Sequence, residues 1–109
     1  MKWKVRFFQT ARGDYPVKNF TEEQERSTFA KIIHSIELLE THGPFLKPPY
    51  SKKIRQNLYE LRIPGKITIR VLYTAYKNQF FLLHAFKKKT QKTPPKEIKT
   101  ALDRMKESI

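Results

Sequence analysis

The sequence predicts a small α+β domain with an antiparallel sheet, a long N-terminal helix and a short C-terminal helix. Two segments space their apolar residues three or four apart, which is typical of helices that cover a sheet. Four other segments alternate apolar and polar residues or form short apolar runs, which is typical of strands. With 109 residues the chain is long enough for one modest core, so we expect a single domain over residues 1–109.

The N-terminal part predicts one strand and the long helix. Residues 3–8 alternate with period two and indicate the strand. The pattern Thr21-Glu22-Glu23-Gln24 is a capping box and Gly43-Pro44 is a stop signal, so we expect a helix over about residues 22–42. Its apolar stripe consists of Phe29, Ile32, Ile33, Ile36 and Leu39.

The second half predicts a three-stranded meander and the short helix. Residues 44–56 contain three prolines and predict a connector with a short helical turn at residues 50–55. Thr93 is a suitable N-cap for the last helix, with Pro94 at the first helical position. Strands are expected at residues 58–63, 67–76 and 79–86, and the last is apolar on both faces, which favours a central position.

The charge balance indicates a polyanionic partner. The chain has 23 Lys and Arg residues against 10 Asp and Glu, which gives a formal net charge of +13. RNA or DNA is the first candidate partner, a membrane surface the second and an acidic protein the third. An aromatic content of 13% favours a folded domain over a disordered basic tail.

Several classes of protein are disfavoured by what the sequence contains. Without cysteine, neither a disulfide framework nor a thiolate metal site is possible. The N-terminus builds no apolar signal segment, and the longest apolar run, Phe80–Leu83, is far too short to span a membrane. The three histidines are scattered, and acidic residues do not cluster near them. We therefore expect a cytoplasmic protein without a metal or cofactor and without a membrane partner.

The meander carries cations that could share one face. Glu60 and Arg62 are two residues apart on the first strand and therefore point the same way. Arg70 is the only charged residue within the second strand, and His84 is the only ionisable group within the third. If the strand registers align, Arg62, Arg70 and His84 converge beside the run Lys87–Lys89.

Each of these signals also has a structural explanation. A strand arginine can lie in solvent or pair with Glu60, and a single strand histidine can simply pack. A lysine run is usually solvated. The three tyrosines of the meander are expected to pack across strands rather than to stack on bases; they are Tyr59, Tyr73 and Tyr76.

Such a cation set suits RNA cleavage that needs no metal. The ribose 2′-hydroxyl attacks the adjacent phosphate, and Arg and Lys stabilise the negative charge that builds on the non-bridging oxygens. A histidine, or a lysine whose pKa is lowered by neighbouring cations, can transfer protons near neutral pH. The crowding of Lys87–Lys89 favours such a lowered pKa.

Three strings of residues resemble a known family. They are Leu58-Tyr59-Glu60-Leu61-Arg62, then Arg70-Val71-Leu72-Tyr73, then Leu82-Leu83-His84-Ala85-Phe86-Lys87-Lys88-Lys89-Thr90-Gln91-Lys92-Thr93-Pro94. Together with Glu97, Ile98, Ala101 and Arg104, they resemble the phage-derived Gp49-like branch of the RelE/HigB toxin superfamily. The resemblance spans about residues 1–105 in element order and is most specific over residues 58–104.

The resemblance implies a RelE-like, microbial-RNase-like fold and ribosome-dependent cleavage of mRNA in the A site. It also implies neutralisation by a co-expressed antitoxin, commonly a helix-turn-helix DNA-binding protein. Family members rely on basic residues of the sheet, at positions that match Arg62, Arg70 and the pair Lys87–Lys88. Many relatives carry a Tyr or His near the C-terminus, and residues 106–109 offer neither. His84 or a lysine from residues 52–53 or 87–89 then has to transfer the proton.

We therefore predict the toxin of a toxin–antitoxin pair, a metal-independent endoribonuclease whose partners are mRNA on the ribosome, rRNA and an antitoxin. A ParE-like inhibitor of DNA gyrase and a non-catalytic basic RNA-binding module are the alternatives. The predicted catalytic residues are Arg70, Arg62, Lys87, Lys88 and His84, with Arg70 first for stabilising the phosphate. The predicted RNA-binding residues are Lys47, Lys52, Lys53, Arg55, Lys89 and Lys92.

Overall fold

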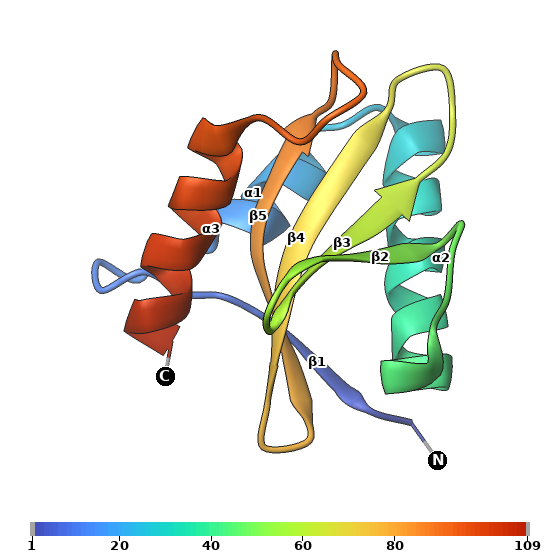
Figure 1. The fold of residues 1–109 in the computed structure, drawn as a ribbon. Helices are drawn as coiled ribbons and strands as arrows, with labels where there is room; N and C mark the ends of the chain where they lie inside the picture. Colours follow the sequence, from blue (N-terminus) through green and yellow to red (C-terminus); the bar gives the residue numbers. More distant parts are fainter. Residues whose placement is uncertain (1, 109) are drawn as a thin grey trace.

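The computed structural model describes residues 2–108 as a five-stranded sheet with helices on both faces (Figure 1). The strands lie in the order β1-β5-β4-β3-β2. No helix within these residues is long and apolar enough to cross a membrane. The elements are β1 Lys4–Phe7, α1 Pro16–Glu22, α2 Arg26–His42, the short 3-10 helix η1 Gly43–Phe45, β2 Ser51–Arg55, β3 Leu58–Ile63, β4 Ile69–Tyr76, β5 Gln79–Lys87 and α3 Pro95–Ser108.

Alternating side chains divide the core between the two faces of the sheet. On one face, α1 and α2 contribute Val17, Ile32 and Leu39 to a cluster with strand residues. On the other, α3 places Ala101 in a cluster with Leu72 and other strand residues. We call this second side the α3 face. The helix packs mainly on β4 and β5, which leaves room for polar side chains on β3.

β1 makes the sheet mixed. It pairs in parallel with β5, with Lys4 opposite Gln79 and Phe7 opposite Leu82, whereas the other neighbouring strands are antiparallel. The prediction of an antiparallel sheet is therefore wrong at this strand, because an alternating pattern identifies a strand without giving its partner. The central position of β5 is confirmed, since it lies between β1 and β4.

The helix predicted over about residues 22–42 corresponds to α2, which begins four residues later, and α1 precedes it as a helix that the sequence did not predict. The long helix is therefore the second of the three α-helices in the described residues. α1 begins at Pro16, whose fixed φ suits a first helical turn. Thr21, predicted to cap the long helix, lies inside α1, where its Oγ1 donates to the carbonyl oxygen of Val17 at 2.8 Å. The capping-box prediction is wrong because this hydroxyl bonds back to the preceding turn. α2 begins only after Glu25.

Residues 51–55 form an edge strand, where the sequence predicted a connector with a helical turn. β2 pairs with β3 in antiparallel fashion, with Lys52 opposite Glu60. The hydroxyl oxygens of Ser51 and Tyr73 lie 2.6 Å apart in a buried hydrogen bond that joins β2 to β4. The prolines that indicated a loop all precede the strand, and tertiary contacts of this kind decide whether a short polar segment becomes a strand.

A bulge in β5 turns His84 toward α3. Leu72 is opposite His84 while Tyr73 is opposite Leu82, so Leu83 is the extra residue. α3 starts one residue later than predicted, at Pro95, and the hydroxyl of Thr93 bonds to the sheet instead of capping the helix. The fold is thus a small α+β domain with a mixed sheet and three α-helices within the described residues.

Candidate active site around Glu60

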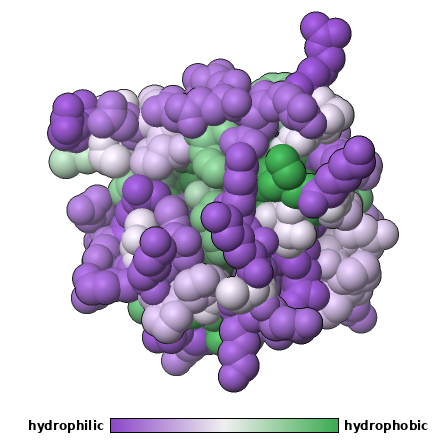
Figure 2. All heavy atoms as spheres, turned by 90° about the horizontal axis from the view of Figure 1, so that it is seen from above, coloured by the Kyte–Doolittle hydropathy of each residue, from purple (hydrophilic) through white to green (hydrophobic). Residues whose placement is uncertain are grey.

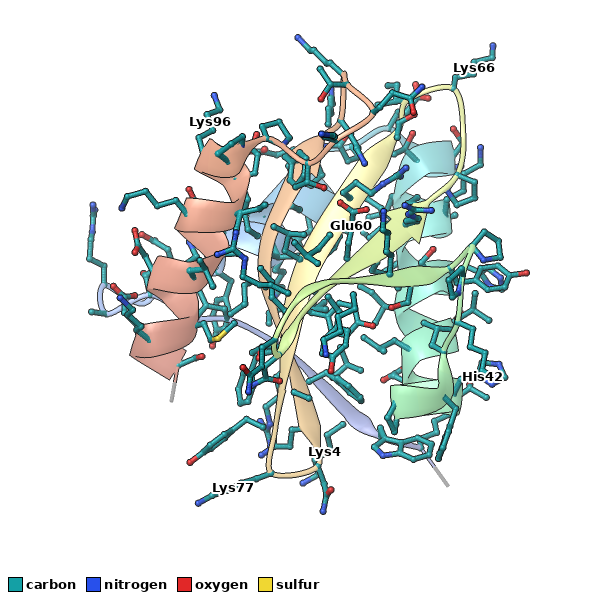
Figure 3. All side chains as sticks on the ribbon, viewed as in Figure 1. Lys4, His42, Glu60, Lys66, Lys77 and Lys96 are labelled. Atoms are coloured by element: carbon teal, nitrogen blue, oxygen red, sulfur yellow. The ribbon has the colours of Figure 1, made fainter. Side chains whose placement is uncertain are left out.

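Three cationic side chains converge on one buried carboxylate on the α3 face. The Oε1 atom of Glu60 lies 3.4 Å from Nε of Arg62, 3.4 Å from Nε of Arg70 and 3.8 Å from Nζ of Lys88. Figure 3 shows the Glu60 carboxylate over the sheet with nitrogen-ended side chains close to it. We call these four residues the Glu60 cluster. Three positive charges against one negative charge leave two in excess, which suits an anionic ligand.

Strand register brings the cluster together. Glu60 and Arg62 share a face because they are two residues apart on β3. Arg70 is directly opposite Arg62 on β4. Lys88 follows the last residue of β5, and its backbone N–H donates to the carbonyl oxygen of Thr68 at 2.8 Å, which holds it beside the start of β4. The structure therefore brings Arg62 and Arg70 together. From the run Lys87–Lys89, only Lys88 joins them among the described contacts of Glu60.

Glu60 is held at both of its carboxylate oxygens. Only 1% of its side chain is exposed. Arg62 Nε donates to Oε1 at 3.4 Å, and Thr93 Oγ1 donates to Oε2. Because Thr93 lies just before α3, its bond ties the β5–α3 connection to β3. A buried carboxylate needs such partners, since an unpaired charge away from water is very unfavourable.

Arg70 is placed by charge rather than by a hydrogen bond to Glu60. Its Nε is buried and has no hydrogen-bond partner among the described residues, so the 3.4 Å contact with Glu60 is an ion pair. Its Nη1 donates to the carbonyl oxygen of Ile69 at 3.0 Å. Burial lowers the pKa of Arg70 and Glu60 opposes this effect, but a guanidinium remains charged in a protein. With five N–H donors, the group keeps most of them for a ligand.

Lys88 is the cluster's candidate for proton transfer. Its side chain is only 6% exposed. Burial lowers the pKa of Lys88, the positive charges of Arg70, Arg62 and Lys52 lower it further, and Glu60 raises it. A lowered pKa gives the amine a larger neutral fraction, which lets it exchange a proton with a substrate. The sequence predicted this effect from the adjacent lysines, but burial is its largest cause and the cations that add to it come from β2, β3 and β4.

His84 lies on the same face in a separate group with α3. Its Nε2 is 2.7 Å from Oε1 of Glu97, and its Nδ1 is 3.2 Å from Nη1 of Arg104. Its ring stacks on Phe86, with the centroids 5.5 Å apart. Leu72 lies between Glu60 and His84 in the strand register, so the two are separated by two strand spacings, roughly 9–10 Å.

The hydrogen bonds of His84 define its protonation state. A guanidinium can only donate, so Nδ1 accepts from Arg104 and the Nε2–H donates to Glu97. This is the neutral imidazole. Burial lowers the pKa of His84, the hydrogen bond to Glu97 raises it, and the charge of Arg104 lowers it again. Both ring nitrogens are engaged within the protein, so His84 is less available to a substrate than Lys88.

The other predicted cations divide between the two faces. Lys52 and Arg55 lie on the α3 face, because they pair with β3 residues that point there. Lys53 and Lys87 pair with residues of the opposite core and lie on the opposite face. Lys47, Lys89 and Lys92 are exposed in loops. Viewed from the end that carries the β3–β4 and β5–α3 connections, hydrophilic side chains cover most of the surface, and hydrophobic atoms show between them in separate patches (Figure 2).

Sequence reasoning missed Glu60 as the centre of the cluster and Glu97 as the partner of His84. Glu60 left a usable signal, because it lies two residues before Arg62 in an otherwise apolar strand. Glu97 fits the family pattern, but its pairing with His84 left no signal, because only the docking of α3 brings the two together. Within residues 2–108, no three His, Cys, Asp or Glu residues are grouped so that they could hold a metal ion.

The family model described as phage-derived protein Gp49-like matches residues 19–106. The chain belongs to the Gp49-like family. This confirms the resemblance to the Gp49-like branch, and the matched region of this Gp49-like protein contains the whole Glu60 cluster and the His84 group. The family is associated with the toxins of toxin–antitoxin systems. A comparison with curated proteins finds no match to the chain.

Proposed function

We propose that this Gp49-like protein is the toxin of a toxin–antitoxin pair and acts as a ribosome-dependent mRNA endoribonuclease. The observation that carries the proposal is the Glu60 cluster, in which two arginines and a lysine of lowered pKa surround one buried carboxylate. The net charge of +13 supports an RNA partner. A co-expressed antitoxin, expected to be a helix-turn-helix protein, completes the proposed system.

In the proposed reaction, the ribose 2′-oxygen forms a bond to the adjacent phosphorus while the bond from phosphorus to the 5′-oxygen breaks. Negative charge grows on the non-bridging oxygens as this happens. Arg70 and Arg62 stabilise this charge, and a guanidinium is suited to the task because it can contact two phosphate oxygens at once. The products are a 2′,3′-cyclic phosphate and a 5′-hydroxyl.

Lys88 is the proposed proton-transfer group. Its neutral amine accepts the proton of the 2′-hydroxyl, and water protonates the leaving 5′-oxygen. The buried position among cations favours this role, because it increases the neutral fraction of the amine. His84 is the second candidate, and its bonds to Glu97 and Arg104 would have to open before it could reach a substrate.

The exposed cations of β2 provide the proposed docking surface for ribosomal and messenger RNA. Lys52 and Arg55 extend the positive α3 face to the edge of the sheet, and Lys89 and Lys92 border it from the β5–α3 connection. Exposed lysines and arginines contact phosphates without reading sequence, so these residues supply affinity rather than codon preference.

An in vitro translation assay with mapping of mRNA ends tests the proposal. The purified protein should cut mRNA only when ribosomes are translating it, and the upstream fragments should carry 2′,3′-cyclic phosphates. A 3′-hydroxyl at the cut would contradict attack by the 2′-oxygen. Inhibition of gyrase supercoiling without mRNA cleavage would favour the ParE-like alternative, and RNA binding without either activity would favour a binding module.

A further inference from the structure

We propose that Glu60 is a positioning residue, which holds Arg62, Arg70 and Lys88 in one arrangement around the scissile phosphate without touching the RNA. The inference deepens the proposed ribonuclease function and rests on it for its kinetic consequences. The contacts of Glu60 with the three cations exist in the free protein, so they can be tested without RNA or ribosomes.

The first support is that one carboxylate contacts all three cations. Oε1 faces Arg62, Arg70 and Lys88, while Oε2 accepts the hydroxyl of Thr93. With 1% of its side chain exposed, Glu60 is too buried for direct contact with a bound RNA. Arg62 and Arg70 are 30% and 15% exposed, so a phosphate reaches them from the solvent side while Glu60 holds them from below.

The second support is electrostatic. Arg62 and Arg70 are directly opposite each other on neighbouring strands, an arrangement in which like charges repel. Glu60 offsets this repulsion and leaves two excess positive charges. A neutral residue in its place would leave three excess charges with nothing to orient them. Attraction for a phosphate would then increase, while the arrangement needed in the transition state would be lost.

The third support is the effect of Glu60 on Lys88. The charged groups that face Lys88 are Glu60 and Arg62 on β3, Arg70 on β4 and Lys52 on β2. Glu60 is the one that favours the protonated amine, and the three cations disfavour it. Removing the carboxylate should therefore lower the pKa of Lys88 further. Because the proposed cleavage reaction uses the neutral amine, the cleavage rate should then reach its plateau at a lower pH.

A purely structural role for Glu60 predicts different results. A buried ion pair is weak evidence for stability, and its removal mainly changes the free energy of unfolding. In protein that remains folded, a structural role would leave the cleavage rate, the ribosome affinity and the pH profile as they are in the wild type. Kinetic and pH measurements on folded protein therefore separate the two roles.

The experiment compares Glu60→Gln with the wild type in single-turnover cleavage on programmed ribosomes. Glu37→Gln is the matched control, because it removes the same charge from an exposed position on α2. We expect Glu60→Gln to lower the cleavage step by about 10²-fold, with ribosome affinity unchanged or tighter and the pH profile shifted to lower pH. A wild-type rate and pH profile in folded Glu60→Gln would overturn the inference, and so would a loss confined to affinity.

A second pair of variants covers the case in which Glu60→Gln fails to fold. Thr93→Val removes the donor to Oε2 and keeps the carboxylate, whereas Thr93→Ser keeps the hydroxyl. We expect Thr93→Val to slow cleavage at unchanged ribosome affinity and Thr93→Ser to restore the rate. Equal rates for both variants would contradict the anchoring of Glu60.

An NMR titration of the Lys88 amine in the free protein separates this inference from the proposed function. The Lys88 pKa should be lower in Glu60→Gln than in the wild type, whether or not the protein cleaves RNA, and an unchanged titration would overturn the coupling. If wild-type protein does not cleave mRNA, the proposed function fails while this test of Glu60 still stands.

Discussion

Arg62 and Arg70 face each other across β3 and β4, and both lie 3.4 Å from the same oxygen of Glu60. Two arginines in a directly opposed pair are unfavourable unless an anion lies between them. Glu60 is that anion in the free protein, and a phosphate approaching from the solvent side can serve as a second one. The pair therefore forms a binding geometry before any ligand arrives, which is the condition for strong electrostatic stabilisation of a transition state.

Replacing Arg70 by alanine should lower single-turnover cleavage by about 10²–10³-fold, the loss typical of one transition-state contact. The fold should persist, because Glu60 keeps its contacts with Arg62, Lys88 and Thr93. Arg12→Ala is the control, since it removes an arginine that is 90% exposed in a loop. Cleavage at the wild-type rate, or loss of the circular dichroism of the folded state, would show that Arg70 has another role.

Replacing Lys88 by arginine should lower the cleavage rate by about 10²–10⁴-fold, because arginine keeps the positive charge but cannot supply a neutral base. The rate of the wild type should rise with pH and level off below the ordinary lysine pKa, since the pKa of Lys88 is lowered. This rise should disappear in the variant. Lys18→Arg, at an exposed position of α1, is the control.

His84→Gln distinguishes the second candidate for proton transfer. Both nitrogens of His84 are engaged, so we expect a small change in rate. A loss as large as that of Lys88→Arg, together with the disappearance of a titration below the ordinary histidine pKa, would instead assign proton transfer to His84.

Replacing Lys52 and Arg55 together by alanine should weaken ribosome binding and reduce its dependence on salt. The double variant makes fewer phosphate contacts, so its binding releases fewer counterions. Lys53→Ala should have a smaller effect, since the register of β2 places this residue on the opposite face of the sheet. A ribosome-pelleting assay over a range of salt concentrations measures both. A loss in Lys53→Ala as large as that in the double variant would contradict docking through the α3 face.

Acidification should destabilise the protein through His84. Burial lowers the pKa of this residue below its ordinary value of 6.5, so the unfolded chain binds a proton more readily than the folded protein. The contribution of His84 to the free energy of unfolding is therefore complete above pH 6.5 and decreases as the pH falls below this value. His84→Gln should reduce the loss of unfolding free energy between about pH 7 and about pH 5, measured by urea unfolding. The exposed His34→Gln is the control.

The sequence predicted those parts of the molecule that depend on local periodicity. The strands expected at residues 58–63 and 67–76 bring Arg62 and Arg70 to one face if their registers align, and the structure has the two directly opposed. The short gap between the strands expected at residues 67–76 and 79–86 is a tight turn at Lys77-Asn78, where both residues have positive φ.

The features that the sequence did not predict depend on contacts between distant segments. β2 is a strand because β3 offers it an edge, and Glu97 reaches His84 because α3 docks on β5. The lowered pKa of Lys88 has the same origin, since its largest cause is burial and the cations that add to it come from three other strands. The sequence identifies the lysine run, but the choice of Lys88 over Lys87 depends on which face of the sheet each side chain occupies.

The parallel pairing of β1 with β5 has a consequence for how the protein assembles during synthesis. Lys4 and Gln79 are register partners although they are 75 positions apart in the sequence. Contacts between such distant segments are slow to form, because the loop between them must close first. Of the five strands, the one made first therefore pairs with the one made last. Lys88 and Thr93 follow β5 in the sequence, so the Glu60 cluster is completed only after all five strands have been made. A partly synthesised chain that stops before residue 88 carries the arginines without the lysine that the proposed chemistry requires.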